Sequence, residues 1–284
     1  MSRTVFVSKT PTDLDEFYNY LLDCGTGKSA ISSYMSLYSC NFYVGCSNNC
    51  AYCYLKKEPL KKEMGGKTPM LKKCFENSQE YAKQCFEKEL ETNLSEIQKH
   101  GLLMSFTTDP LLPETRNLTK FAIEISLKAN VPVKILTKRA DWLHCFDLDM
   151  CEEWKSKINF GFTLTGRDNF EPNASTNAER IEAMKKLHNA GFRMFASIEP
   201  IIDFESSYEM IVKTIEFCDL FKIGLEGGKK YKKEDVNKFV KSVLNCSSTF
   251  SIKGYNPKFY FKDNLLQQAG ICCENFPENL SINK

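Results

Sequence analysis

The sequence has no long apolar run, few histidines and no excess of charge of either sign. Its 284 residues carry 38 basic and 36 acidic side chains, for a formal net charge of +2. This balance gives no overall preference for nucleic acid or membrane surfaces. No window approaches the about 18 consecutive apolar residues of a membrane span, and the opening stretch MSRTVFVSKTPTDLDEF lacks the apolar segment of a secretory signal. These absences predict a cytoplasmic protein that is not associated with a membrane.

Cysteine, in contrast, is abundant. The chain has 13 cysteines, and an odd number without an export signal argues against a disulfide framework. Hydrophobic residues make up 42% and charged residues 26% of the chain, which is ordinary for a globular protein able to bury a full core. We therefore expect reduced thiols, some of which take part in metal chemistry. The chain is expected to be a monomer.

Three cysteines, Cys46, Cys50 and Cys53, lie in the loop GCSNNCAYCYL, residues 45–55. A zinc site normally needs a second close pair of ligands. The three histidines are isolated, and the adjacent pair Cys272–Cys273 is poorly placed to chelate one ion. Buried free thiols are a further reading, but they do not explain why three cysteines gather in a polar loop. Ligation of an iron–sulfur cluster fits better, because three ligands to a cubane leave one iron open for a substrate or cofactor.

From residue 101 onward, short apolar runs alternate with amphipathic segments, a pattern that predicts a parallel sheet with helical crossovers. One more strand before the cysteine loop gives about six or seven β/α units, which suits a full or partial β/α barrel. An open doubly wound sheet is the alternative, and in both architectures ligands bind at the carboxyl ends of the strands. The expected strands are 102–106, 131–137, 158–165, 192–202, 220–226 and 258–262.

Helices are expected between these strands. Two capping-box patterns, Thr176-x-x-Glu179 and Ser206-x-x-Glu209, predict helix starts. Gly191 is placed to end the first of these helices. Apolar residues at three- and four-residue spacing predict two further helices, around 118–125 and 236–243, and a short helix is expected within 141–155.

The pattern Cys-x-x-x-Cys-x-x-Cys, with the aromatic Tyr52 before the last cysteine, resembles the signature of the radical S-adenosylmethionine (SAM) superfamily. The longer stretch NFYVGCSNNCAYCYL resembles that of the spore photoproduct lyase-like, or "DNA repair photolyase", group, with Phe42 in place of the usual proline. The resemblance covers about residues 35–225 and continues, in the expected order, through SFTTDPLLPETRNLT (105–119), ILTK (135–138), FEPNASTNAERIEAMKKLHNAGF (170–192) and EPII (199–202).

This resemblance implies an α/β fold, a partial (β/α)6 TIM-like barrel of the radical SAM type with short N- and C-terminal extensions. We expect an N-terminal extension over residues 1–35 and a radical SAM core over 36–245. A C-terminal extension over 246–284 is expected to pack on the core.

The resemblance also implies two cofactors, a 4Fe-4S cluster and SAM. Cys46, Cys50 and Cys53 are expected to hold the cluster, whose open iron binds SAM. Reductive cleavage of SAM then gives a 5′-deoxyadenosyl radical that abstracts hydrogen from a substrate. The expected SAM contacts are Tyr52 near the adenine, Thr107, Thr108 and Asp109 at the methionine amino group, Thr165 and Arg167 at the ribose and carboxylate, and Glu199 at the ribose or substrate.

Each of these polar residues also has a structural reading. Thr107 and Thr108 are suited to capping the next helix, and Asp109, which precedes a proline, is suited to a turn. Arg167 fits a solvated loop equally well. Glu199 stands among apolar residues and needs a partner, so its alternative is a structural ion pair.

The chain departs from the family at Phe106. Spore photoproduct lyase uses a cysteine in this stretch to return a hydrogen atom to the thymine product, and phenylalanine cannot do so. Repair of a thymine dimer by that route is therefore not implied for this chain. The other cysteines that are candidates to take its place are Cys145, Cys246, Cys272 and Cys273.

Lysines gather in LKKEPLKKEMGGKTPMLKK (55–73) and KKYKK (229–233). These segments fit contacts to DNA or RNA, and they also fit ordinary solvated faces. Lys138 and Arg139 are likewise open to binding a phosphate or carboxylate. An electron donor such as flavodoxin or ferredoxin is an expected partner.

The leading hypothesis is a radical SAM enzyme of the spore photoproduct lyase-like group. Its substrate is left open, and a nucleic acid base or a nucleotide is the favoured candidate. One rival is a radical SAM enzyme that acts on a peptide or small metabolite. The other is a non-catalytic zinc or iron–sulfur module that recognises nucleic acid.

Overall fold

The computed structural model describes residues 30–34 and 37–271. Almost all of the expected N-terminal extension lies outside these residues, as do Cys272 and Cys273. No described helix combines the length and the apolar character that crossing a bilayer requires.

Eight strands form one sheet in the order β1-β2-β5-β6-β7-β8-β9-β10. β1 and β2 pair antiparallel, and all later neighbours pair parallel. Among the described residues no pairing joins the edge strands β1 and β10, so the sheet is a partial barrel and not a closed one. β3 and β4 form a separate antiparallel pair. The strands are β1 Ile31–Tyr34, β2 Leu37–Cys40, β3 Tyr43–Val44, β4 Met70–Leu71, β5 Leu102–Met104, β6 Val133–Thr137, β7 Ile158–Thr163, β8 Arg193–Ile201, β9 Leu220–Leu225 and β10 Lys258–Phe261.

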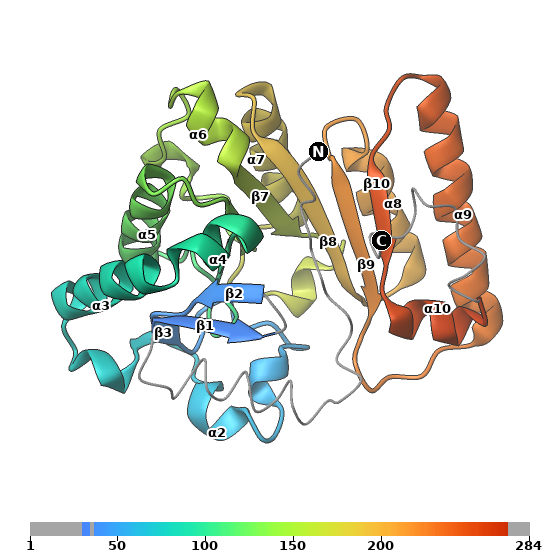
Figure 1. Cartoon of the computed structure of the whole chain (residues 1–284). Coiled ribbons are helices and arrows are strands. Elements are labelled where there is room, and N and C mark those ends of the chain that lie inside the picture. The colour runs from blue at the N-terminus through green and yellow to red at the C-terminus, as the bar shows by residue number, and fades with distance from the viewer. Residues whose placement is uncertain (1–29, 35–36, 272–284) are drawn as a thin grey trace.

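Helices connect the parallel strands and lie around the outside of the sheet (Figure 1). Each crossover brings the chain to the next strand in the sheet, so the carboxyl ends of the parallel strands gather at one edge. The α-helices are α2 Lys61–Met64, α3 Gln79–Thr92, α4 Leu94–His100, α5 Arg116–Lys128, α6 Glu152–Lys157, α7 Asn177–Asn189, α8 Phe204–Thr214, α9 Lys233–Ile252 and α10 Asp263–Ala269; short 3-10 helices are η1 Tyr54–Lys56, η2 Lys73–Phe75, η3 Leu143–Cys145 and η4 Asp168–Phe170.

β7 shows how the sequence separates the two faces of the sheet. Phe160 stacks on Trp142 at a ring-centroid distance of 5.2 Å and meets Phe192 edge-on at 5.3 Å. Successive strand residues point to opposite faces, so Gly161 lies on the other side. A Cβ at Gly161 would lie 2.1 Å from the ring of Phe195. Glycine is therefore required where this aromatic ring crosses the inner face of β7.

The predicted strands and the α/β fold are confirmed by the structure. The capping box of Thr176 and Glu179 is present at the start of α7. The second capping box is wrong, because α8 begins at Phe204, and Asp203 is its N-cap. The Asp203 carboxylate accepts the backbone N–H of Ser206 at 3.0 Å and its hydroxyl at 2.7 Å, so Ser206 serves the cap and does not provide it.

The division into core and extensions stays a prediction. Within the described residues, α9 runs across the expected boundary after residue 245, and β10 continues the sheet beyond it.

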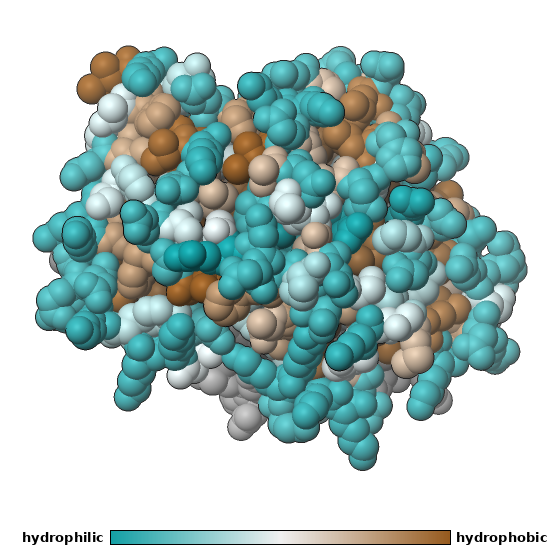
Figure 2. Space-filling model, turned by 180° about the vertical axis from the view of Figure 1, so that it is seen from behind, coloured by the Kyte–Doolittle hydropathy of each residue, from teal (hydrophilic) through white to brown (hydrophobic). Residues whose placement is uncertain are grey.

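On the face seen in Figure 2 the surface is mostly hydrophilic, and apolar residues are scattered over it.

Candidate cluster and SAM site

The cysteine loop begins directly after β3, at Gly45. This glycine has a φ of +83°, and a Cβ there would lie 2.7 Å from the carbonyl oxygen of Thr68. The backbone N–H of Cys46 donates to the carbonyl of Gly66 at 3.0 Å. Only glycine combines this backbone conformation with so close an approach. The start of the loop is thus set against the segment that leads into β4.

The three cysteines of the loop are free thiols, as are the other seven cysteines of the described residues. Cys50 is buried, whereas Cys46 and Cys53 are partly exposed. Burial raises the pKa of Cys46 to about 12, and burial also raises the pKa of Cys50. Without a bound metal these two thiols are therefore protonated near neutral pH, and binding of a cluster must release their protons.

No group of three or more His, Cys, Asp and Glu side chains in the described part of the chain is arranged to hold a single metal ion. Cys46, Cys50 and Cys53 thus share one loop but do not converge on one point. The thiolates that hold an iron–sulfur cubane bind different iron atoms, so the ligands of a cluster need not converge.

The segment after β7 holds the cysteine loop from one side. The N–H of Ala51 donates to the carbonyl of Phe170 at 2.8 Å. Asn173 donates its side-chain amide to the carbonyl of Ser47 at 2.9 Å and its backbone N–H to the carbonyl of Asn48 at 3.4 Å. Residues 170–173, which we call the clamp segment, therefore bind the loop before and after Cys50.

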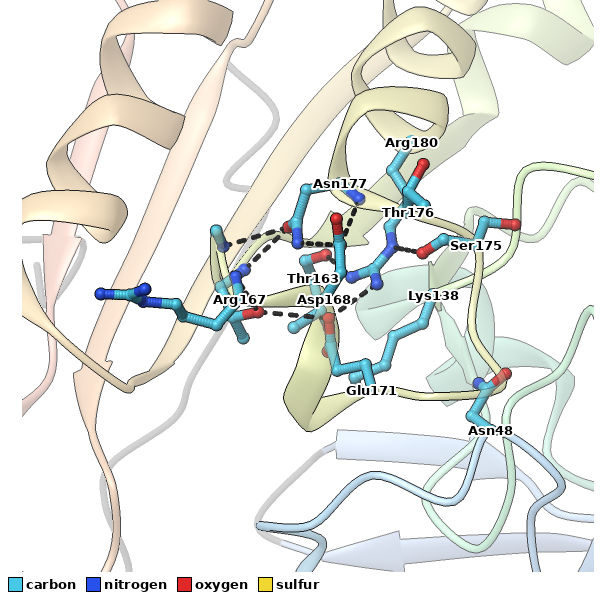
Figure 3. Close-up of polar contacts among 12 residues, drawn as sticks. Asn48, Lys138, Thr163, Arg167, Asp168, Glu171, Ser175, Thr176, Asn177 and Arg180 are labelled. Carbon is cyan, nitrogen blue, oxygen red and sulfur yellow. Dashed lines mark hydrogen bonds and ion pairs between the residues drawn. The ribbon is translucent and has the colours of Figure 1, made fainter.

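Glu171 is the buried centre of the clamp segment. Its carboxylate pairs with Arg180 of α7 at 2.6 Å, and both side chains are 0% exposed. It also accepts hydrogen bonds from the hydroxyl of Tyr52 and, at 3.2 Å, from the hydroxyl of Thr165. Arg180 donates further to the carbonyls of Thr163 at 2.6 Å and Ser175 at 2.7 Å. Figure 3 shows Arg180 reaching from α7 to Glu171.

Tyr52 and Lys138 meet beside this pair. Burial and the Glu171 carboxylate raise the pKa of Tyr52 well above its usual value, so its hydroxyl stays neutral and donates. The Lys138 ammonium lies 5.8 Å from the Tyr52 ring centroid. Burial disfavours the Lys138 charge, but the negative charges of the Cys50 thiolate, Glu171 and Asp109 outweigh that effect and raise the pKa of Lys138. A positive charge is thus fixed next to the cysteine loop.

The end of β5 brings Asp109 to the other side of the loop. Its carboxylate accepts hydrogen bonds from the side-chain amide of Asn48 at 2.8 Å, the backbone N–H of Lys138 at 2.7 Å and the hydroxyl of Thr137 at 2.7 Å. It also accepts from the N–H of Leu111 at 3.0 Å. Asp109 therefore ties the cysteine loop to the ends of β5 and β6. Its predicted contact with SAM stays a prediction.

Thr107 and Thr108, next to Asp109, differ in their surroundings. Thr107 is 0% exposed and donates its hydroxyl to the carbonyl of Tyr43 in β3, just before the cysteine loop. The hydroxyl of Thr108 is buried and has no hydrogen-bond partner within the described residues, and the same holds for the side-chain oxygen of Asn48. Buried polar atoms are normally satisfied, so these two atoms are available to a polar ligand.

The residues predicted at the later strand ends have protein partners. Arg167 pairs with Asp203 at the start of α8, and its side chain is 49% exposed. Glu199 pairs with Lys262, after β10, at 2.5 Å. A Cβ at Gly224 would lie 3.1 Å from the carboxylate of Glu199, so this glycine leaves room for the pair. The structure thus brings Thr165 and Asp109 close to the cysteine loop, to which Tyr52 itself belongs. Arg167 and Glu199 are held at neighbouring strand ends.

The sequence interpretation missed Glu171 and Arg180. Both lie within the motif FEPNASTNAERIEAMKKLHNAGF, nine residues apart. A signal was available, since Arg180 is the fourth residue of a helix with a clear capping box. In the structure this residue of the first turn of α7 donates to the carbonyl of Thr163, at the end of the preceding strand.

Comparison with solved structures identifies the fold. One spore photoproduct lyase structure, with bound AdoMet and dinucleoside spore photoproduct, is 19% identical with a TM-score of 0.50; the match covers 73% of this chain and 59% of that one. Another spore photoproduct lyase structure, with dinucleoside spore photoproduct, is 20% identical with a TM-score of 0.53 over 76% of this chain and 64% of that one. The chain has the spore photoproduct lyase fold. The predicted resemblance to this radical SAM group is confirmed at the level of the fold.

The match to the spore photoproduct lyase fold spans about three-fifths of those proteins, and no family model matches the chain. Two curated relatives are uncharacterized proteins. ORF301 of Acidianus two-tailed virus is 23% identical over 208 residues, 69% of this chain and 67% of that protein. MJ0683 of Methanocaldococcus jannaschii is 24% identical over 238 residues, 77% of this chain and 82% of that protein.

Proposed function

We propose that this chain is a radical SAM enzyme that binds a 4Fe-4S cluster through Cys46, Cys50 and Cys53. The observation that carries the proposal is the position of three free thiols in one loop, held against the carboxyl ends of β5, β6 and β7 in the spore photoproduct lyase fold. Bound there, a cluster and SAM would supply a 5′-deoxyadenosyl radical for hydrogen abstraction.

The residues around the loop fit these two groups. Lys138, whose side chain is half-buried, provides a cation near Cys50, which suits an anionic cluster or a carboxylate. Thr108 and Asn48 offer unsatisfied buried oxygens next to Asp109, which suit an ammonium group. The protein's own part is to bind and orient the cofactors and to exclude water from the radical.

Anaerobic reconstitution tests the proposal. The protein is loaded with iron and sulfide, reduced with dithionite and mixed with SAM, and 5′-deoxyadenosine is measured. We expect product from the wild-type chain and none from Cys50→Ala, which should also lose the cluster absorbance. Cys151→Ala, at an exposed free thiol, is the matched control and should be active. An intact cluster without cleavage of SAM would contradict the enzymatic proposal, and zinc without iron would contradict the cluster.

For the substrate we propose a nucleic acid base. Two lysine-rich segments, 55–73 and 229–233, lie near each other, because Lys57 of the first pairs at 3.3 Å with Glu226, three residues before the second. Lys72 is buried and is not part of this surface, but Lys61, Lys62 and Lys67 are exposed. Exposed lysines on both sides of one ion pair suit a phosphate backbone.

Deuterium transfer from labelled oligonucleotides into 5′-deoxyadenosine tests this substrate. Labelled peptides, tested in the same way, represent the rival substrate class.

The hydrogen that reaches the product needs a donor other than Phe106. Cys145 is exposed in η3, and Cys246 contacts Tyr208 in the helical layer outside the sheet. Neither cysteine lies on the inner face of the sheet. The proposed reaction therefore differs in its last step from the reaction of spore photoproduct lyase.

An electron donor such as flavodoxin or ferredoxin is part of the proposal, since cleavage of SAM consumes one electron.

A further inference from the structure

We propose that Glu171 is a positioning residue that sets the shape of the cysteine loop through Tyr52, with Arg180 as its anchor. The inference rests on the proposed cluster-binding function, but it concerns contacts within the protein and can be tested without a cluster.

The first step of the argument is the place of Tyr52 in the loop. It lies between Cys50 and Cys53, so any movement of its ring changes the relation of these two thiols. Its side chain is fixed at the far end, where the hydroxyl donates to Glu171. One residue earlier, Ala51 donates its N–H to Phe170 at 2.8 Å. Two successive loop residues are therefore bound to two successive residues of the clamp segment.

The second step is the rigidity of Glu171. A buried carboxylate is costly unless it is paired and fully hydrogen-bonded. Arg180 meets this need at 2.6 Å and is itself bound to the carbonyls of Thr163, at the end of β7, and Ser175. The pair thus connects the cysteine loop to β7 and to the first turn of α7. Figure 3 shows these contacts converging from the strand end, the clamp segment and the helix.

The third step is that this arrangement exceeds what fold stability requires. Similar apolar side chains in place of a buried ion pair often preserve or improve stability. Here one carboxylate oxygen of the charged pair accepts the hydroxyl of Tyr52, 119 residues away in sequence. This hydrogen bond fixes the direction in which the Tyr52 side chain points, which an apolar pair could not do. In metal sites, groups that orient the ligand-bearing residues typically change metal affinity about 10–100-fold when they are replaced.

Three variants test the proposal. Tyr52→Phe removes only the hydroxyl and leaves the pair of Glu171 and Arg180 intact. Glu171→Gln keeps the side-chain shape but removes the charge. Glu182→Gln is the matched control, the same substitution at an exposed position of α7. Each is measured as apoprotein by hydrogen exchange at the Ala51 amide, and after reconstitution by the rate of iron loss to a chelator.

For Tyr52→Phe and Glu171→Gln we expect the Ala51 amide to exchange at least about tenfold faster than in the wild type. Iron loss should be about 10–100-fold faster. The double variant should lose iron no faster than the more severe single variant, because both changes break one connection. Glu182→Gln should match the wild type in both measurements.

Two results would overturn the proposal. One is a hydrogen-exchange rate at the Ala51 amide of Tyr52→Phe that equals the wild-type rate. The other is an exchange rate that rises at Ala51 and rises equally at the core amides of β8 in both variants. That result would show that Glu171 only stabilises the fold. If the wild-type chain takes up no iron, the proposed function fails, and the exchange experiment still decides whether Glu171 positions the loop.

Discussion

Buried carboxylates near the cysteine loop serve mainly to organise the protein. Asp109 accepts four hydrogen bonds, one from the loop, two from the end of β6 and one from Leu111 in its own turn. Glu171 accepts from Tyr52, Thr165 and Arg180. Such acids cannot be recognised from their sequence alone as positioning groups, because ligand-binding and positioning carboxylates occur at the same strand ends. The polar atoms left for a ligand are instead neighbours of these acids, the hydroxyl of Thr108 and the side-chain oxygen of Asn48.

Asp109→Asn should destabilise the apoprotein by about 2–4 kcal/mol. All four partners of Asp109 are donors, so an amide NH2 in place of one oxygen would face donors that it cannot accept from. The free energy of unfolding, from urea titration followed by circular dichroism, measures the effect. Asp149→Asn, at an exposed residue, should stay within about 0.5 kcal/mol of the wild type. Equal stability of Asp109→Asn and the wild type would mean that these hydrogen bonds contribute nothing net.

At the scale of elements, apolar patterning was sufficient for the parallel strands and for α5, α7 and α9. A buried apolar run located β6. The capping box of Thr176 and Glu179 located the start of α7. Sequence patterning failed where two chemically similar caps compete, at Asp203 and Ser206, because their order depends on which side chain faces the first turn. It also gave no prediction for α3, or for the β3–β4 pair, which comprises two residues in each strand.

The cap of α8 makes stability depend on pH. Burial alone would raise the pKa of Asp203, but hydrogen bonds from Ser206 and the pairing with Arg167 lower it to about 2. A carboxyl whose pKa is lower in the folded state stabilises the protein above its unfolded pKa of about 4. This stabilisation is lost as pH falls from about 4 to 2. Because the side chain is 31% exposed, we expect only about 1 kcal/mol.

Comparison of the wild type with Asp203→Asn between pH 7 and pH 2 measures this contribution. Asparagine still caps a helix, so the difference in unfolding free energy reports mainly the charge. It should be constant from pH 7 to about 5 and should vanish near pH 2. A difference that does not change with pH would assign the effect to packing.

At the scale of the whole molecule, eight of the ten described strands form one continuous sheet. The last strand, β10, pairs with β9, and Phe259 stacks on Phe221 with ring centroids 5.1 Å apart. Lys262, just after β10, reaches Glu199 in β8. The region expected to be a C-terminal extension therefore contributes to the same edge of the sheet as the candidate site.

A chain ending at residue 252 should be markedly less stable than the full chain. It keeps α9 but loses β10 and α10, so β9 becomes an exposed edge and Phe221 loses its stacking partner. We expect aggregation or a melting temperature lower by more than 5 °C, on the order of several kcal/mol of lost packing. Thermal denaturation beside the full chain decides this. An unchanged melting temperature would support a separable extension.

The two lysine-rich segments lead to a prediction about the surface as a whole. If both contact a nucleic acid backbone, binding of a single-stranded oligonucleotide should weaken with salt, with about 0.7 units of log–log slope for each phosphate contact. Replacing both Lys61 and Lys62 of α2 with alanine removes two such contacts and should reduce the slope by about 1.4 units. Replacing Lys185 and Lys186, an equally exposed adjacent pair on α7, should not change it. Figure 1 places α2 and α7 at opposite ends of the molecule.

Fluorescence anisotropy over a range of potassium chloride concentrations measures the slopes. Equal slopes for the two double variants, or no binding at low salt, would remove the nucleic acid from the proposal and leave a peptide or small metabolite as the substrate.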